Sequence, residues 1–235
     1  MLKKTRNYTI LFLLLLTFIT ACKSKVSCNE EDAKSCLFFP VEEKGKMDLS
    51  KGEAYLKSQT IKMNEEALSA SNIVSAELFE ETIQLTFEEK EDEKTHVKWN
   101  GKVLGDDDSY AIFVKNDDIL IGNIFFKNAL YKVRDVGNGI HQVLKVDPAG
   151  ETKCGGGIIP DLDQGEPRAN PCASDPGDFI DVMVLYTPAA KNGAGGKAQI
   201  EAEIYLAQHE TNLSYLNSMM NFRIALVHVA EYTYT

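Results

Sequence analysis

The sequence predicts an α+β protein in which a β-rich, antiparallel unit is followed by an incomplete strand–helix–strand unit. Between residues 80 and 147, short runs of β-forming residues alternate with turn signals every eight to ten residues. A stretch crowded with Pro and Gly then separates this region from a segment with a different periodicity. The chain therefore divides into five segments, which are 1–21, 22–52, 53–150, 151–178 and 179–235.

Residues 1–21 have the pattern of an export signal. Three basic residues precede the apolar run ILFLLLLTFIT, which is too short to span a membrane comfortably. The stretch Ile19–Cys22 then resembles the bacterial lipoprotein box, in which the signal is cut before the cysteine. This resemblance implies that Cys22 becomes the lipid-modified first residue. An ordinary secretory signal cut near Ala21 is the alternative.

Lipidation at Cys22 predicts an exported, membrane-anchored protein. Several acyl chains anchor a protein stably, since each buried methylene contributes about 0.8 kcal/mol. Lys23 follows the cysteine where an inner-membrane retention signal would have Asp, so we expect the outer membrane or cell surface. The formal charge of −10 falls to about −13 once the three signal-peptide charges are removed, which argues against nucleic acid as a partner.

The next segment, 22–52, is polar and reads as a tether that the small apolar patch CLFFPV partly holds down. Besides Cys22 the chain has four cysteines, and an exported compartment permits them to form disulfides. The pairs that are close in sequence are Cys28 with Cys36 and Cys154 with Cys172. The other two ways of pairing these four cysteines remain open.

Segment 53–150 predicts an antiparallel meander that closes into a sandwich or a barrel-like sheet. Asn100–Gly101 indicates a two-residue hairpin, because both positions tolerate positive φ. No helical period is present between residues 80 and 147. The β-rich runs are 81–89, 95–105 with the hairpin inside it, 109–115, 119–126, 129–136 and 140–147.

Segment 151–178 is a linker, and the segment after it predicts a strand, a helix and a second strand. The apolar run 179–187 indicates a buried strand that ends at Pro188, with a loop over AAKNGAGG. The run 221–235 predicts another strand, parallel to the first by the usual crossover rule. A 3.6-residue period predicts a helix from Lys197 to Met219, with one apolar face made of Ile200, Ile204, Ala207, Thr211, Tyr215 and Met219.

The dipeptide His209–Glu210 begins like the helix of a zinc protease, but the second histidine is missing. A zinc helix needs histidines at i and i+4, and Leu213 occupies that position. His209 also lies half a turn from the apolar face, so we expect it to be a solvated side chain on the outer side of the helix. The sequence therefore assigns no metal ligand and no catalytic residue to this helix.

Residues 178–235 resemble the start of metzincin zinc endopeptidase domains of the bacterial reprolysin-like type, with the peptidyl-Asp metalloendopeptidases as the nearest suggestion. The resemblance rests on DVMVLYTPAAKNGAGG, then HETNLSYLNS, then NFRIALVHVAEY. Glu210, Thr211, Asn212 and Tyr215 match the E-T-N-x-x-Y-like stretch of the family's first long helix. The resemblance implies that this part is the beginning of a metzincin α/β domain.

The preceding β-rich segment resembles the pro-region of such secreted proteases. It contains, in this order, the short motifs W-x-G, G-x-I, Y-x-V and G-x-G-x-H-x-V, which begin at Trp99 and end around His141. We expect Trp99 to be a core aromatic residue and His141 to be a strand residue beside a turn, neither of them catalytic.

The family's chemistry depends on H-E-x-x-H-x-x-G-x-x-H, whose three histidines hold zinc while the glutamate deprotonates the bound water. This chain lacks that motif, and the resemblance implies that it lies beyond Thr235. We therefore expect no cofactor and no peptide hydrolysis from this chain alone, and zinc and protein substrates only for a complete domain. The expected partners are the membrane, the missing catalytic part and a related protease.

Cys154 has two possible roles. Metzincin pro-regions often carry a cysteine before a glycine that caps the zinc, and Cys154–Gly155 stands in the corresponding place. The alternative is a disulfide with Cys172, which would contribute about 3 kcal/mol in the chain-entropy picture. The two roles exclude each other, because a bridged sulfur cannot bind zinc.

Two other functions remain open. The first alternative is a non-enzymatic surface lipoprotein, whose β-rich domain is a binding or protease-inhibitory module. A carbohydrate-binding or adhesin-type β-domain rests on the meander pattern alone, and a fold by itself does not give a function.

Overall fold

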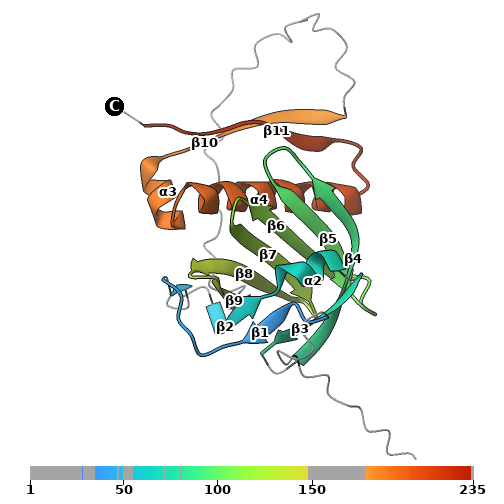
Figure 1. The fold of residues 1–235 in the computed structure, drawn as a ribbon. Coiled ribbons are helices and arrows are strands. Elements are labelled where there is room, and N and C mark those ends of the chain that lie inside the picture. Colours follow the sequence, from blue (N-terminus) through green and yellow to red (C-terminus); the bar gives the residue numbers. More distant parts are fainter. Residues whose placement is uncertain are drawn as a thin grey trace, which may run out of the picture.

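The computed structural model describes residues 28, 35–46, 48–49, 55–70, 72–79, 81–147 and 178–233. The largest feature is a nine-stranded sheet in which all neighbouring strands are antiparallel, and the sheet curls until it is nearly closed (Figure 1). The expectation of a β-rich, antiparallel, barrel-like unit is therefore confirmed. The strand order is β1-β2-β9-β8-β7-β6-β5-β4-β3.

These strands and the short helix α2 together form what we call the β-rich unit. The meander from β4 to β9 follows the predicted runs closely, whereas the earlier strands have no clear alternation in the sequence. The elements are β1 (Phe38–Pro40), β2 (Tyr55–Met63), α2 (Glu65–Ala70), β3 (Ile73–Leu78), β4 (Glu81–Asp92), β5 (Val97–Val103), β6 (Tyr110–Asn116), β7 (Ile119–Phe126), β8 (Ala129–Gly137) and β9 (Ile140–Val146).

The two ends of the sheet meet at Ser75 of β3. Its carbonyl accepts from the amide of Leu37 at 2.7 Å, and its own amide donates to the carbonyl of Ser35 at 2.6 Å. A disulfide joins Cys28 to Cys36 beside this junction. Leu37 and its neighbour Phe38 are fully buried. The described part of the predicted tether is thus built into the sheet rather than hanging from it.

Strand β6 is buried on both faces, which is why its sequence AIFV is continuously apolar instead of alternating. Ala111 and Phe113 point into the core of the β-rich unit, where Phe113 packs edge-on against Phe38 and Phe87. Ile112 and Val114 point outward and belong to a second apolar cluster.

The predicted hairpin at Asn100–Gly101 is wrong, because both residues lie inside β5. Asn100 pairs with Ile112 of β6 and with Glu89 of β4, at a bulge in β4 between Phe87 and Glu89. A Cβ on Gly101 would lie 2.1 Å from the carbonyl oxygen of Thr86. Glycine is therefore needed for a close approach of two strands, a role that a local turn signal cannot distinguish from a hairpin.

The terminal unit, residues 178–233, contains the expected parallel strand pair and its crossover. It consists of β10 (Phe179–Tyr186), α3 (Pro188–Ala194), α4 (Lys197–Asn217) and β11 (Arg223–Glu231). The predicted loop over AAKNGAGG is wrong, because Pro188 begins α3 rather than only ending a strand. Proline is accepted in a first helical turn, and the hydroxyl of Thr187 caps that turn by accepting from the amide of Ala190 at 3.1 Å.

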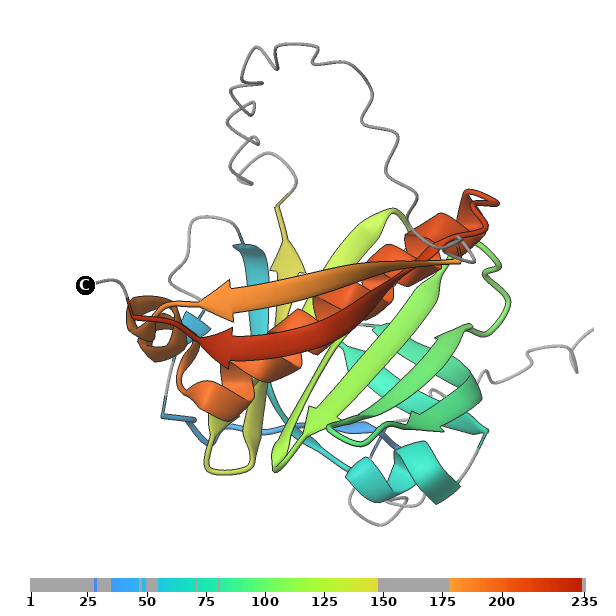
Figure 2. The same ribbon diagram turned by 90° about the horizontal axis from the view of Figure 1, so that it is seen from above.

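Helix α4 lies between two β layers, with β10 and β11 on one side and the β-rich unit on the other (Figures 1 and 2). The predicted apolar face is wrong in its orientation, since Ala207 and Met219 are exposed. A helix covered on two sides has no single apolar stripe, so its period does not show which side is buried more deeply. The side chains of α4 that are buried are Gln199, Ile200, Ala202, Tyr205, Leu206 and His209.

Candidate functional site

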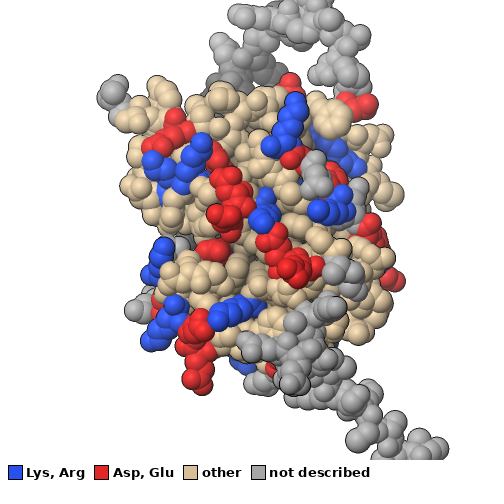
Figure 3. Space-filling model, in the orientation of Figure 1, with Lys and Arg blue, Asp and Glu red and all other residues tan. Residues whose placement is uncertain are grey.

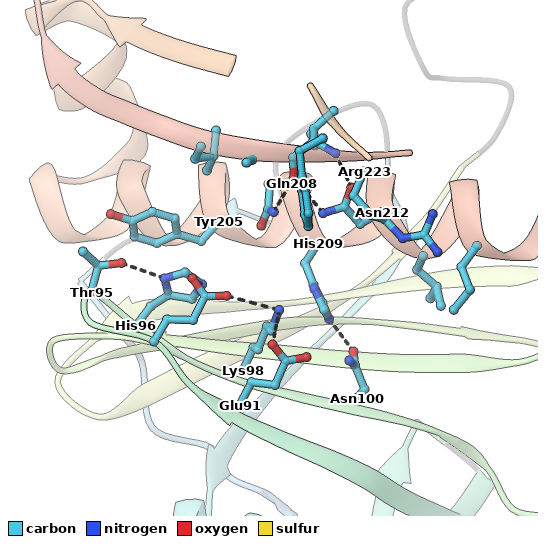
Figure 4. A pocket seen from close by; sticks show the side chains of 17 residues that line it. Glu91, Thr95, His96, Lys98, Asn100, Tyr205, Gln208, His209, Asn212 and Arg223 are labelled. Atoms are coloured by element: carbon cyan, nitrogen blue, oxygen red, sulfur yellow. Dashed lines mark hydrogen bonds and ion pairs between the residues drawn. The ribbon is translucent and has the colours of Figure 1, made fainter. Parts of the chain in front are cut away.

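A cleft of about 520 Å³ lies where the two units meet (Figure 4). One wall is polar and comes from β4, β5 and the turn that joins them. The opposite wall is more apolar and comes from the C-terminal half of α4 and the first residues of β11. The lining residues that carry charge or ring nitrogens are Glu91, Glu93, His96, Lys98, His209 and Arg223.

His209 is the central side chain of this cleft, and the expectation that it is solvated is wrong. Only 6% of the residue is exposed, and its Nε2 donates to the side-chain carbonyl of Asn100 in β5. Burial, and then the positive charge of Lys98, lower the pKa of His209 to about 4. The side of α4 that faces away from β10 and β11 therefore faces the β-rich unit, not solvent.

His96 lies beside it, in the turn after β4. Its ring stacks on Tyr205 of α4, with 4.1 Å between the ring centroids and 6° between the planes. Its Nδ1 is 3.0 Å from the hydroxyl of Thr95. Its Nε2 is 3.9 Å from Glu93 and has no hydrogen-bond partner among the described residues. Burial lowers the pKa of His96 against the opposing effect of Glu93, so the stacked ring is neutral at neutral pH.

Lys98 is tied to the polar wall by two carboxylates, those of Glu91 at 2.7 Å and Glu93 at 3.2 Å. Burial opposes its charge, but the hydrogen bonds with these carboxylates outweigh that effect and raise the pKa of Lys98. The charges on this wall therefore compensate one another within the protein.

Glu210 connects α4 to the β-rich unit on the other side of the helix. Its Oε1 accepts from the amide of Asn123 at 2.7 Å and from the hydroxyl of Tyr110 at 3.2 Å. Arg134 in turn donates to the Oδ1 of Asn123 at 2.9 Å, which orients the Asn123 amide so that its nitrogen faces the carboxylate. Burial, and then Glu210, raise the pKa of Tyr110, so its hydroxyl remains a donor.

The other residues of the E-T-N-x-x-Y-like stretch also have structural contacts. The side chain of Asn212 donates to the carbonyl of Ile224 at 3.0 Å and accepts from the amide of Ile224 at 2.8 Å. It thus satisfies both backbone groups of Ile224, as the backbone of a neighbouring strand would. Tyr215 packs edge-on against Phe222, with 4.9 Å between their centroids. Thr211 donates back to the carbonyl of Ala207 within the helix. The motif therefore holds α4 to its two neighbouring layers.

These contacts define what the cleft can do chemically. Its lining contains one hydroxyl–imidazole contact, between Thr95 and Nδ1 of His96, and the charges of Lys98, Glu91 and Glu93 compensate one another. Within the described ranges, no group of three or more His, Cys, Asp or Glu residues could hold a metal ion. The donor set of a metzincin zinc site is thus not found among these residues.

The predicted cysteine sites are placed only in part. Cys28 and Cys36 form a disulfide. Cys22, Cys154 and Cys172 lie outside the described residues. Trp99 belongs to the core of the β-rich unit. His141 is a buried residue of β9 whose Nε2 donates to the carbonyl of Leu120 at 3.0 Å.

Acidic and basic side chains are interspersed over the face shown in Figure 3, and among the described residues they do not gather there into one basic patch. No helix in the described part of the chain is long and apolar enough to cross a membrane.

The residues of the polar wall could not be recognised in the sequence as site residues. Glu91 and Glu93 lie in a charged stretch that reads as a turn, His96 and Lys98 lie in the β-rich run that follows it, and Asn100 reads as part of a hairpin. Their partner residues in α4 lie about a hundred positions further along the chain, so nothing local indicates the pairing.

No family model matches the chain, and no curated protein matches it. Among solved structures, one described as "Structure of a chaperone-substrate complex" is similar to this chain with a TM-score of 0.37 and 15% sequence identity. That match covers 55% of this chain and 97% of the other. A likeness this weak carries no argument about function.

Proposed function

We propose that this chain is the N-terminal part of an exported zinc metalloendopeptidase, comprising its pro-region and the start of its catalytic domain, and that it is inactive by itself. In this proposal the β-rich unit is the pro-region. The terminal unit is the first strand, long helix and second strand of a metzincin domain. A lipid on Cys22 holds the protein at the outer membrane or cell surface.

The observation that carries the proposal is the uncovered outer face of β10 and β11. Parallel strands normally belong to sheets that are covered on both faces. Here α4 covers one face, and no further strand joins the pair in the described part of the chain. The other face exposes large apolar side chains, and Met183, Leu185 and Val227 are between 48% and 60% exposed. Such a surface is expected where another part of an α/β domain packs.

The contacts of α4 support a pro-region role for the β-rich unit. Burying Tyr205 and Leu206 against β6 and β7 removes from water the side of the helix that an isolated strand–helix–strand unit would expose. Glu210 and His209 fix the helix on that surface by hydrogen bonds. The β-rich unit thus supplies a second apolar layer against α4.

The decisive test is to sequence the DNA that follows the codon for Thr235 and then to assay the protein for peptide hydrolysis. We expect an in-frame H-E-x-x-H-x-x-G-x-x-H downstream, together with zinc-dependent peptide hydrolysis by the extended chain and none by residues 1–235. Replacing the motif glutamate by glutamine in the extended chain is the matched control. A stop codon with no zinc motif, or chelator-sensitive hydrolysis by the present chain, would contradict the proposal.

The lipid anchor is tested separately in cells that process bacterial lipoproteins. Labelled palmitate should be incorporated into the wild-type chain and not into the variant Cys22→Ser, whereas Cys28→Ser should be labelled normally. Equal labelling of wild type and Cys22→Ser would refute the anchor.

A non-enzymatic surface lipoprotein with a binding or protease-inhibitory β-rich unit is the second candidate. The cleft between the units favours it, because a cavity of about 520 Å³ falls in the size range of ligand pockets. A downstream stop codon in the DNA would select this function over the first.

A further inference from the structure

The outer face of β6 and β7 is a surface shaped for a helix. Ile112, Val114 and Ile121 form an apolar stripe there, and none of the three has any exposed surface. Their cover comes from the terminal unit, chiefly Ala202 and Leu206 of α4. The β-rich unit does not need this cover for its own core, because a separate apolar cluster fills its interior.

Polar contacts at both ends of the stripe fix how the helix lies. Near the start of α4, Gln199 donates to the carbonyl of Asp135 at 2.6 Å, and Asn116 donates to the carbonyl of Ala198 at 3.1 Å. Further along, His209 meets Asn100 and Glu210 meets Asn123. These contacts involve particular side chains at both ends, so they specify the register and direction of the helix as well as its position.

The covalent connection between the units is long. Thirty residues, 148–177, separate the end of the described β-rich unit from the start of the terminal unit. A connection of that length raises the local concentration of one unit near the other but does not dictate their orientation. The contacts themselves must therefore select the bound arrangement.

From these observations we infer that the β-rich unit is a helix-recognition module that holds the terminal unit without a covalent link, including the terminal unit of a second copy of this chain. The inference rests on the proposed function for its biological meaning, since it makes the pro-region a partner that acts between molecules. Its recognition elements are the apolar stripe on β6 and β7 together with the acceptor and donor pairs at Asn100, Asn123 and Asp135.

The test starts from the full chain with a site for a sequence-specific protease placed between residues 148 and 153, ahead of Cys154, so that a Cys154–Cys172 disulfide would not join the two pieces. After cleavage, native mass spectrometry and size-exclusion chromatography at micromolar concentration should find the two pieces together. Mixing cleaved samples of isotopically heavy and light protein should give hybrids of a heavy β-rich piece with a light terminal piece. Separation of the wild-type pieces, or precipitation of the terminal piece alone, would overturn the inference.

Two variants locate the contact. Leu206→Asp places a charge on α4 against the apolar stripe and should abolish retention after cleavage, whereas Met219→Asp, at a residue of the same unit that is 90% exposed, should not. Glu210→Ala keeps the apolar contact but leaves Asn123 without its carboxylate, and it should weaken retention about tenfold or more. Equal retention of Glu210→Ala and Met219→Asp would overturn the inference. This result is independent of peptidase activity, so it can fail while the proposed function stands, and the reverse also holds.

Discussion

The β-rich unit and the terminal unit bury their apolar side chains in different ways. The β-rich unit has its own interior, in which Phe113 packs against aromatic residues of β1 and β4. The terminal unit has little interior of its own, and its two most buried side chains, Ala202 and Leu206, lie in the cluster shared with the β-rich unit. We therefore expect the β-rich unit to stay folded without the terminal unit, and the terminal unit to depend on the β-rich unit for its stability.

The largest effect should come from opening the core of the β-rich unit. Phe113→Ala should lower the free energy of unfolding by about 3–5 kcal/mol, because it removes a fully buried ring. Hydrogen exchange should show that both units lose protection together, since the surface that α4 covers is lost. Phe179→Ala, at an exposed phenylalanine of β10, is the control and should change little. A terminal unit that keeps its protection in Phe113→Ala would break the comparison.

Acid should weaken the junction between the units next. The pKa of His209 is about 4 in the folded protein and 6.5 in the unfolded chain. Its stabilising effect is therefore fully present above pH 6.5 and is lost as the pH falls towards 4, by about 3 kcal/mol at most. The lowered pKa values of His96 and His141 act in the same direction.

His209→Gln should flatten this dependence in urea unfolding measured at pH 7, 5.5 and 4.5. His228→Gln, at an exposed residue of β11, should leave it as in the wild type. Parallel pH profiles for the two variants would show that His209 does not sense acid at this junction.

Removing the contact between α4 and β11 should have a smaller and more local effect. Asn212→Ala deletes two hydrogen bonds with Ile224 and should destabilise the start of β11 by about 1–3 kcal/mol. The exchange rate of the Ile224 amide should rise, while amides in the β-rich unit keep their rates. Asn217→Ala, at the exposed end of α4, is the matched control. An unchanged Ile224 amide in Asn212→Ala would refute this role.

The smallest effect on stability should come from the uncovered face of the strand pair. Met183→Lys combined with Leu185→Lys should change the free energy of unfolding by no more than about 0.5 kcal/mol, because both side chains are exposed. Binding of the apolar dye ANS should fall. Val182→Lys, whose side chain alternates to the α4 side of β10, should destabilise the terminal unit clearly. Similar losses for both changes would show that the outer face is covered in solution.

Local patterns were sufficient for the parts of the fold that depend on local physics. The β-forming runs and the turn signals between them, from 81 to 147, predicted the segments that form β4 to β9, although Asn100 and Gly101 lie within β5 instead of forming a hairpin. The parallel pair and the helix between its strands were also predicted. The short strands β1 and β3 carry few residues in which to show a period, and the structure stabilises them through pairing with β2 and β4, which are separate segments of the chain.

The sequence by itself therefore predicted the strand-forming runs from 81 to 147 and the strand, long helix and strand of the terminal unit, but not the short helices α2 and α3 or the strands before β4. Only the tertiary structure decided that Gly101 lies within a strand, that α4 faces two layers, and that His209 is buried. The physical reason is that each of these depends on a partner distant in the chain, such as Asn100 for His209 or Thr86 for Gly101. A local period reports that a residue is buried against something, whereas only the folded chain specifies which residue that is.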